Sequence, residues 1–205
     1  MRAALACLIA SSLLTARTAR AEQPLSTSAG IDRACDAAEK SAAKHATVGR
    51  IFADVAPDEP GAQPIWRSFS STKALEHAIP DRTPHAQAKV WPAVAGVVFV
   101  EIFFTSDSGD WAQFADLCYR PDGTLARAID TYNTFLAGND DSEGVSRVHT
   151  LHFDTGGKVV SKRSKLLDLQ THRPVKRSFM VDQEDRIFLH VTDLPFSALL
   201  SASAQ

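Results

Sequence analysis

The sequence predicts an α+β fold in which an N-terminal helix packs on a curved antiparallel β-meander of about six or seven strands. Two observations support this prediction. First, the pattern L-x-aromatic-x-x-x-G-x-aliphatic occurs twice, displaced by 34 residues, between runs rich in aromatic and β-branched residues. Such runs around a glycine-containing turn are typical of β-hairpins, and successive hairpins form a meander. Second, small apolar residues recur at helical spacing before any of these strands.

Residues 1–21 have the composition of a signal peptide. Arg2 gives a positive start, residues 3–14 form an apolar run too short to span a bilayer, and Ala19-Arg20-Ala21 places small residues at the −3 and −1 positions of a cleavage site. Cys7 lies inside the apolar run, so a lipidated cysteine is an alternative. We therefore expect an exported protein, periplasmic or secreted, with residues 22–205 forming a single α+β domain.

Cys35 and Cys118 are the two cysteines that follow the signal segment. In an oxidising compartment an even pair predicts one disulfide, with two separately buried thiols as the alternative. By loop closure, a bond across roughly 83 residues constrains the unfolded chain by about 4 kcal/mol. Because Cys35 is predicted to lie on the helix and Cys118 in the first hairpin, the bond would attach the helix to the sheet.

The helix is expected over residues 31–46, where the small apolar positions form one stripe. These positions are Ile31, Ala34, Cys35, Ala38 and Ala42. Residues 48–92 are harder to interpret, because six prolines interrupt any long element. A short strand at residues 50–55 and a two-turn helix at residues 72–78 are expected there, within a stretch that suits a lid or a surface loop.

The strands follow from residue 96 onward. Residues 96–105, GVVFVEIFFT, are β-branched and aromatic almost throughout, which predicts a strand covered on both faces. The first hairpin spans residues 111–135 and the second spans residues 145–169. A third unit, from residues 179–181 to residues 187–189, keeps the spacing but lacks the glycine. The tail after Pro195 predicts a final short helix.

Glu101 is the most informative single residue. It is the one charge in its strand and shares a strand face with Val97, Phe99 and Phe103. If that face is buried, desolvation raises the pKa of the carboxyl group, as in a pocket acid. A glutamate paired with lysine or arginine, or lying on a solvated sheet face, explains the same pattern.

The histidines and the acidic loop predict no metal site. His149 and His152 are the closest pair, but residues three apart on a strand point to opposite faces. The acidic loop at residues 139–144 has an EF-hand appearance, but in that register Thr150 occupies the twelfth position, which requires glutamate. We therefore expect no metal and no cofactor.

Charge excludes one class of partner. Three of the 22 basic residues lie in the signal segment, so 19 remain against 24 acidic ones and the net charge becomes −5. Nucleic-acid binding needs a basic face and is not expected. The one basic strand divides its cations, with Lys158 and Lys162 on one side and Arg163 and Lys165 on the other. This division is typical of edge protection; an acidic partner or a membrane surface is the less favoured alternative.

These observations favour an exported, non-catalytic binding module. Its curved sheet would hold a small apolar ligand or a segment of an envelope protein through Glu101, Phe99, Phe103, Trp111 and Tyr119. One alternative is a structural or protein-interaction component of the cell envelope that binds through its sheet edge or its basic strand. A second alternative is a small exported hydrolase that uses Glu101 and a histidine.

Overall fold

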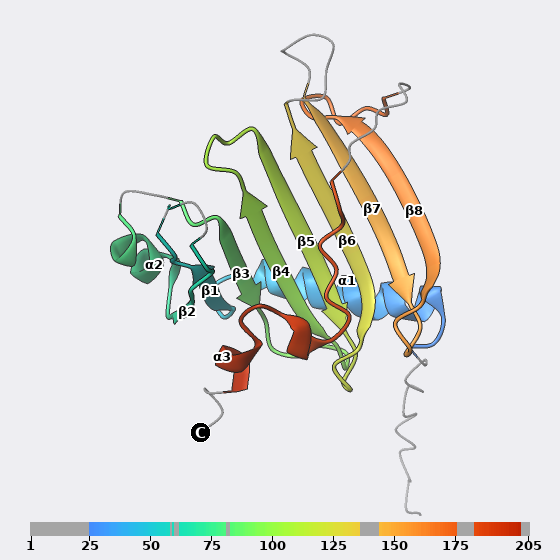
Figure 1. The fold of residues 1–205 in the computed structure, drawn as a ribbon. Helices are drawn as coiled ribbons and strands as arrows, with labels where there is room; N and C mark the ends of the chain where they lie inside the picture. The colour runs from blue at the N-terminus through green and yellow to red at the C-terminus, as the bar shows by residue number, and fades with distance from the viewer. Residues whose placement is uncertain are drawn as a thin grey trace, which may run out of the picture.

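The computed structural model describes residues 25–57, 59, 62–80, 83–135, 144–175 and 183–201. The predicted signal segment and most of the acidic loop lie outside the described residues. Within these ranges the chain forms one open antiparallel sheet in the order β2-β1-β3-β4-β5-β6-β7-β8 (Figure 1). The strands are β1 Arg50–Asp54, β2 Trp66–Phe69, β3 Ala86–Val90, β4 Val98–Thr105, β5 Trp111–Tyr119, β6 Leu125–Thr134, β7 Val145–Phe153 and β8 Val159–Asp168. The predicted fold class is confirmed, with eight strands rather than six or seven.

The three predicted helices are also present, as α1 Ser28–Lys44, α2 Thr72–Ala78 and α3 Ser197–Ser201. A 3-10 turn that was not predicted, η1 Val191–Asp193, precedes α3. The Thr27 side chain accepts a hydrogen bond of 3.1 Å from the Gly30 backbone N–H at the start of α1. Ser71 accepts one from the Ala74 backbone at the start of α2. Such side-chain acceptors satisfy N–H groups that the first helical turn leaves unpaired, which explains where both helices begin.

The repeated sequence pattern corresponds to two equivalent hairpins, β5–β6 and β7–β8. Gly123 and Gly157 occupy the same place in the two turns, with φ of 82° and 80°, a conformation that side chains with a Cβ rarely adopt. The strand pairing shifts register after Cys118 in the first hairpin and after His152 in the second. The repeat therefore encodes both the turn and an irregularity in the adjoining strands.

The expectation that residues 48–92 form a lid or a surface loop is wrong, because much of this stretch belongs to the sheet. This stretch supplies β1, β2 and β3 as well as α2, and β1 lies between β2 and β3. The strands β2 and β3 have only four and five residues, and Pro64 and Pro84 lie just before them. So few residues show little periodicity, which is why the sequence did not reveal them.

The predicted third hairpin is wrong in its second half. Residues 187–189 form no strand; they belong to residues 183–201, a segment that crosses the sheet and that we call the C-terminal strap (Figure 1). The strap pairs with the sheet through an isolated bridge between Thr124 and His190. Its apolar side chains pack onto the sheet core instead of extending the meander. Residues 179–181 lie outside the described part of the chain.

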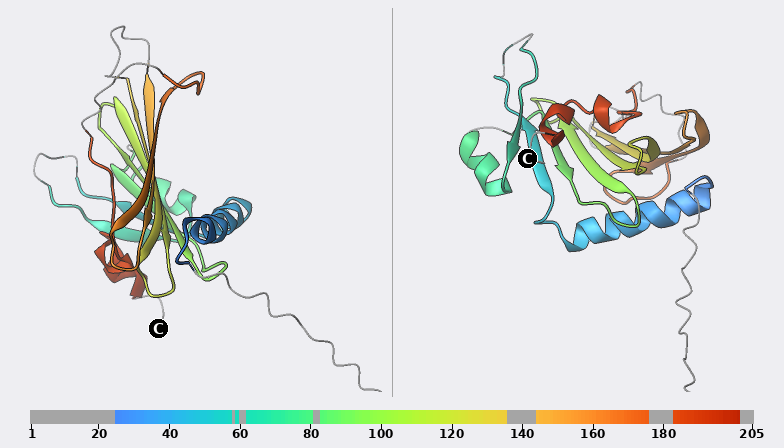
Figure 2. Two further views of the ribbon diagram at one scale, coloured as in Figure 1. Left: turned by 90° about the vertical axis from the view of Figure 1, so that its right-hand side faces the viewer. Right: turned by 90° about the horizontal axis from the view of Figure 1, so that it is seen from below.

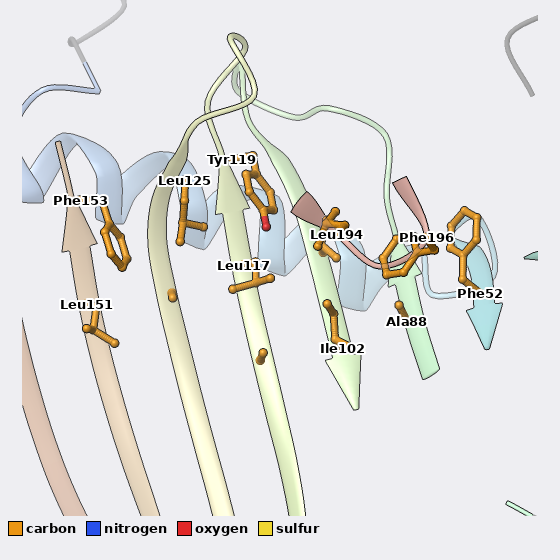
Figure 3. Close-up of a cluster of buried hydrophobic side chains, with 13 residues drawn as sticks. Phe52, Ala88, Ile102, Leu117, Tyr119, Leu125, Leu151, Phe153, Leu194 and Phe196 are labelled. Carbon is orange, nitrogen blue, oxygen red and sulfur yellow. The ribbon is translucent and has the colours of Figure 1, made fainter. Parts of the chain in front are cut away.

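The strap covers one face of the sheet, which we call the strap face and which carries Val100, Leu117 and Leu151. Figure 3 shows Leu194 and Phe196 of the strap among side chains from the strands. Both are buried, and the Phe196 ring stacks on Phe52 with centroids 4.7 Å apart. The C-terminal tail thus completes a core that the strands alone would leave exposed to solvent.

Helix α1 covers part of the opposite face, which we call the helix face. Its small residues Cys35, Ala38 and Ala42 pack against Phe99 and Cys118 of the sheet. The predicted disulfide is confirmed between Cys35 and Cys118, and it joins α1 directly to β5. Since the strap packs on the other side of β4, the predicted cover on both faces of this strand is found around Phe99, whereas Glu101 and Phe103 lie beyond α1.

Candidate binding surface

Helix α1 covers only one end of the helix face. Facing residues on neighbouring strands form rows across the sheet, and α1 packs over the row that contains Phe99 and Cys118. The strands continue well beyond α1 (Figure 1; Figure 2, left). Eight residues of the next two rows make up what we call the upper helix face: Glu101, Phe103, Phe114, Asp116, Ile129, Thr131, Val148 and Thr150.

The centre of the upper helix face is apolar and accessible. All eight of its residues are half-buried, and none belongs to the buried clusters formed by the described residues. The rings of Phe103 and Phe114 contact each other across β4 and β5, with centroids 5.1 Å apart. Ile129 and Val148 extend the surface onto β6 and β7. Contiguous apolar side chains of this kind are typical of interaction sites.

Two facing carboxyl groups border this apolar centre on the side of α1. Glu101 and Asp116 are direct neighbours across β4 and β5, and Lys89 of β3 faces Glu101 from the other side. Burial, followed by the charges of Glu101 and of Glu39 on α1, raises the pKa of Asp116 to about 7. The Asp116 carboxyl group thus lacks a sufficient positive neighbour, and a cation placed beside it would stabilise its charged form.

The position of α1 is fixed by ion pairs as well as by the disulfide. Arg127 of β6 is buried, and its guanidinium lies 2.6 Å from the Asp36 carboxylate, 3.3 Å from Asp32 and 3.4 Å from Glu39. The His152 ring nitrogen Nε2 lies 2.7 Å from Asp32. Burial tends to raise the pKa of Asp32, but its contacts with His152 and Arg127 lower it overall. The acidic side of α1 is therefore matched to cationic and donor groups of the sheet.

A second histidine–aspartate pair lies on the strap face. His149 Nδ1 is 2.7 Å from Asp185 of the strap, and Arg147 donates to the same carboxylate at 3.0 Å. Asp130, fully buried beside them, accepts hydrogen bonds from Gln113 at 2.8 Å and from the Arg186 backbone N–H at 3.0 Å. Burial raises the pKa of Asp130. These contacts hold the strap against the sheet.

The two histidines therefore point to opposite faces, as their spacing predicts. His149 binds the strap and His152 binds α1, so each attaches one covering segment. Within the described ranges, no group of three or more histidine, cysteine, aspartate or glutamate side chains is arranged to hold a metal ion. A carboxyl–histidine pair is also an element of general-base catalysis. Here Asp185 additionally has Arg147 and Lys162 as neighbours, as expected of a structural tether.

The residues predicted to bind a ligand do not form one site. Glu101 and Phe103 lie together on the upper helix face, whereas Phe99 is buried beneath α1. Trp111 and Tyr119 belong to the strap face, where the Tyr119 hydroxyl donates to the Phe188 carbonyl at 3.0 Å. Successive residues of a strand point to opposite faces of the sheet, so the five predicted residues are divided between the two faces.

Six of the eight residues of the surface were not identified from the sequence, among them Phe114, Asp116 and Ile129. Their importance depends on the register of β5 and β6. Parity alone places Phe114 and Asp116 on one face of the first hairpin. Pairing β4 with β5 through the turn at residues 106–110 would then have placed them opposite Phe103 and Glu101. The short turn between β4 and β5 was therefore the sequence feature from which Phe114 and Asp116 could have been identified.

Two cavities lie away from this surface. One, of about 280 Å³, is lined by residues around the end of β1 and the β4–β5 turn, including Asp54, His85 and Asp107. The other, of about 540 Å³, is lined by residues 183–188 of the strap. Neither contains a residue that the sequence predicted as a ligand contact.

No described helix is both long enough and apolar enough to cross a membrane. Comparison with protein-family models, with curated proteins and with solved structures finds no match to this chain.

Proposed function

We propose that this protein is an exported, non-catalytic binding module whose upper helix face receives an amphipathic helical segment of a partner protein in the cell envelope. One observation carries the proposal: the contacting rings of Phe103 and Phe114, with Ile129 and Val148 on the next two strands around Thr131, make a mainly apolar surface beyond the end of the sheet that α1 covers. At the other end of the helix face α1 packs over Phe99 and Cys118, and the strap packs on the opposite face of the sheet.

The dimensions of the surface suit a helix better than a small ligand. From Glu101, in the row nearest α1, to Thr105, one row beyond the upper helix face, the β4 strand extends about 13 Å, at about 3.3 Å per residue. This length is close to the diameter of one α-helix with its side chains, about 10–12 Å. The four strands from β4 to β7 add a width of about 14 Å. A helix docked beside α1 would complete a helical layer on the sheet.

The charges around the surface define the chemistry of the partner. Glu101 and Asp116 lie on β4 and β5 in the row nearest α1, and Lys165 of β8 faces Val148 at the far end of the second row. The expected partner is a helix with an apolar stripe. It would place a lysine or arginine near Asp116 and an acidic residue near Lys165. Such complementarity selects the partner and its orientation more than it adds affinity.

Export is part of this proposal. It is supported by the signal-like composition of residues 1–21 and by the buried Cys35–Cys118 pair at bonding distance. Disulfides persist in oxidising compartments and are rare in the cytosol. A partner in the periplasm or outside the cell follows from this location.

The proposal is tested by photo-cross-linking in the native host. A benzoylphenylalanine replaces Thr131 at the centre of the surface, and the same group replaces Thr155 in the exposed β7–β8 turn as the matched control. We expect an adduct specific to position 131, whose attached peptide has apolar residues at helical spacing and a flanking basic residue. An adduct with a lipid or a small molecule, equal adducts at both positions, or no adduct would contradict the proposal.

A further inference from the structure

The outer edge of β8 has backbone groups that no described residue pairs with. On this strand the Leu166 carbonyl and the Asp168 N–H point away from β7, because they bond to the Val175 N–H and the Arg173 carbonyl, each at 2.9 Å. Alternate residues of a strand present their backbone groups to the same side. The N–H and C=O groups of Ser164 and Lys162 therefore also point outward, at a sheet edge where no described residue bonds to them.

The chain itself shows that this edge accepts another strand. Residues 173–175 lie antiparallel along the end of β8, with a bridge between Leu167 and Pro174. Residues 176–182 lie outside the described part of the chain, and β8 continues past Leu166 to Lys162 and Ser164, to whose outward backbone groups no described residue bonds. An incoming segment would thus continue an interface whose first positions are already occupied in register.

The charges of β8 select the incoming segment. Lys162 lies on the strap side of the strand, and Arg163 and Lys165 lie on the helix side, as their alternation predicts. The side chains of Lys162 and Arg163 are 51% and 62% exposed despite contacts with Asp185 and Asp32, so these ion pairs leave both cations accessible. A second copy of β8 would place cations opposite cations, which is unfavourable across strands.

We propose that the open edge of β8 binds an extended acidic segment of another protein as an added β-strand. Backbone hydrogen bonds to Lys162 and Ser164 provide the pairing, and the exposed cations on both sides of the strand provide the selectivity. The same cations that prevent self-association at the edge favour a partner of opposite charge. The backbone groups of this site lie outside the upper helix face, whereas Lys165 borders both sites. The methylated peptide and Ser164→Pro therefore test this proposal independently of the first.

The probe for this site is a short fluorescein-labelled peptide of glutamate–threonine repeats, and binding is followed by fluorescence anisotropy. A version that is N-methylated at alternate residues keeps its charge but loses the backbone groups that pair with a strand. We expect saturable binding of the unmodified peptide and a loss of about tenfold or more in affinity on methylation. Equal affinity of the two peptides, or no saturable binding at millimolar peptide, would overturn the proposal.

Substitutions in β8 provide the second arm of the test. Ser164→Pro removes an outward N–H without touching the pairing with β7, and Ser164→Ala is its matched control. Only the proline variant should weaken binding, by about tenfold, and Lys165→Glu should weaken it as well. If the proline variant fails to fold, the methylated peptide alone decides. Stronger binding of the protein to phosphatidylglycerol vesicles than to the peptide, with equal loss in Lys165→Glu, would indicate a membrane surface and contradict a protein partner.

Discussion

At the scale of single residues, the main consequence of the fold is the facing pair of Glu101 and Asp116. The sequence identified Glu101 because it is the one charge in an apolar strand. Asp116 was not identified, since its neighbour across the sheet depends on strand register and not on local pattern. The raised pKa of Asp116 is a direct result of that register together with burial.

The raised pKa of Asp116 predicts a specific pH dependence. The folded protein retains a proton on this group at pH values where the unfolded chain has lost it, so the free energy of unfolding falls as pH rises from about 4 towards 7. Asp116→Asn should flatten this decline, as measured by urea unfolding at a series of pH values. The groups with lowered pKa, such as Asp32, act below this window. Parallel profiles for the variant and the wild type would show that Asp116 is not perturbed.

Arg127 offers a second test at the residue scale. Its guanidinium is buried and contacts three carboxylates of α1, each of which remains partly exposed to solvent. Arg127→Met should lower the free energy of unfolding by about 1–2 kcal/mol, and Arg127→Lys should recover part of the loss. If the methionine variant has the stability of the wild type in urea unfolding, the ion pairs do not fix α1.

At the scale of secondary-structure elements, two covering segments are attached to the sheet by similar means. Helix α1 is held by the disulfide and by Asp32 with His152, and the strap is held by Asp185 with His149. The hairpins and α1 were predictable, because their periodicity and turn residues are local. The strap was not, because its residues 187–189 resemble a strand and only tertiary packing makes them a cover.

Removal of the disulfide should be the most destabilising change at this scale. The Cys35–Cys118 bond closes a loop with a sequence separation of 83, for which loop entropy gives a loss of about 4 kcal/mol. The double variant Cys35→Ala, Cys118→Ala should show this loss in urea unfolding, and reduction of the wild type should reproduce it. A loss below about 1 kcal/mol would mean that the bond does not constrain the unfolded chain as the loop model requires.

The strap should detach locally when its tether is removed. Asp185→Ala eliminates the contacts with His149 and Arg147, so amide hydrogen exchange in residues 183–190 should accelerate while the strands stay protected. Glu76→Ala, at an exposed position of α2, is the control and should leave the strap unchanged. Unaltered exchange in Asp185→Ala would show that apolar packing alone holds the strap.

At the scale of the whole molecule, the accessible surface is determined by how much of each sheet face is covered by the strap or by α1. The strap closes one face, whereas α1 crosses the other face at one end and leaves the upper helix face accessible (Figure 1). The sequence predicted a helix on a meander correctly. It contained no local signal for the position at which α1 crosses the strands, because that position depends on the contacts of Arg127, His152 and the disulfide.

The most direct test of the central claim is the affinity of the cross-linked partner segment, prepared as a synthetic peptide, for two variants with an added lysine. Thr131→Lys places a charge at the centre of the upper helix face, and Val160→Lys places the same charge at an exposed apolar position of β8. The account predicts that Thr131→Lys weakens binding about tenfold or more at unchanged stability, while Val160→Lys has the affinity of the wild type. Equal affinity of the Thr131→Lys variant and the wild type would contradict the assignment of this face as the binding surface.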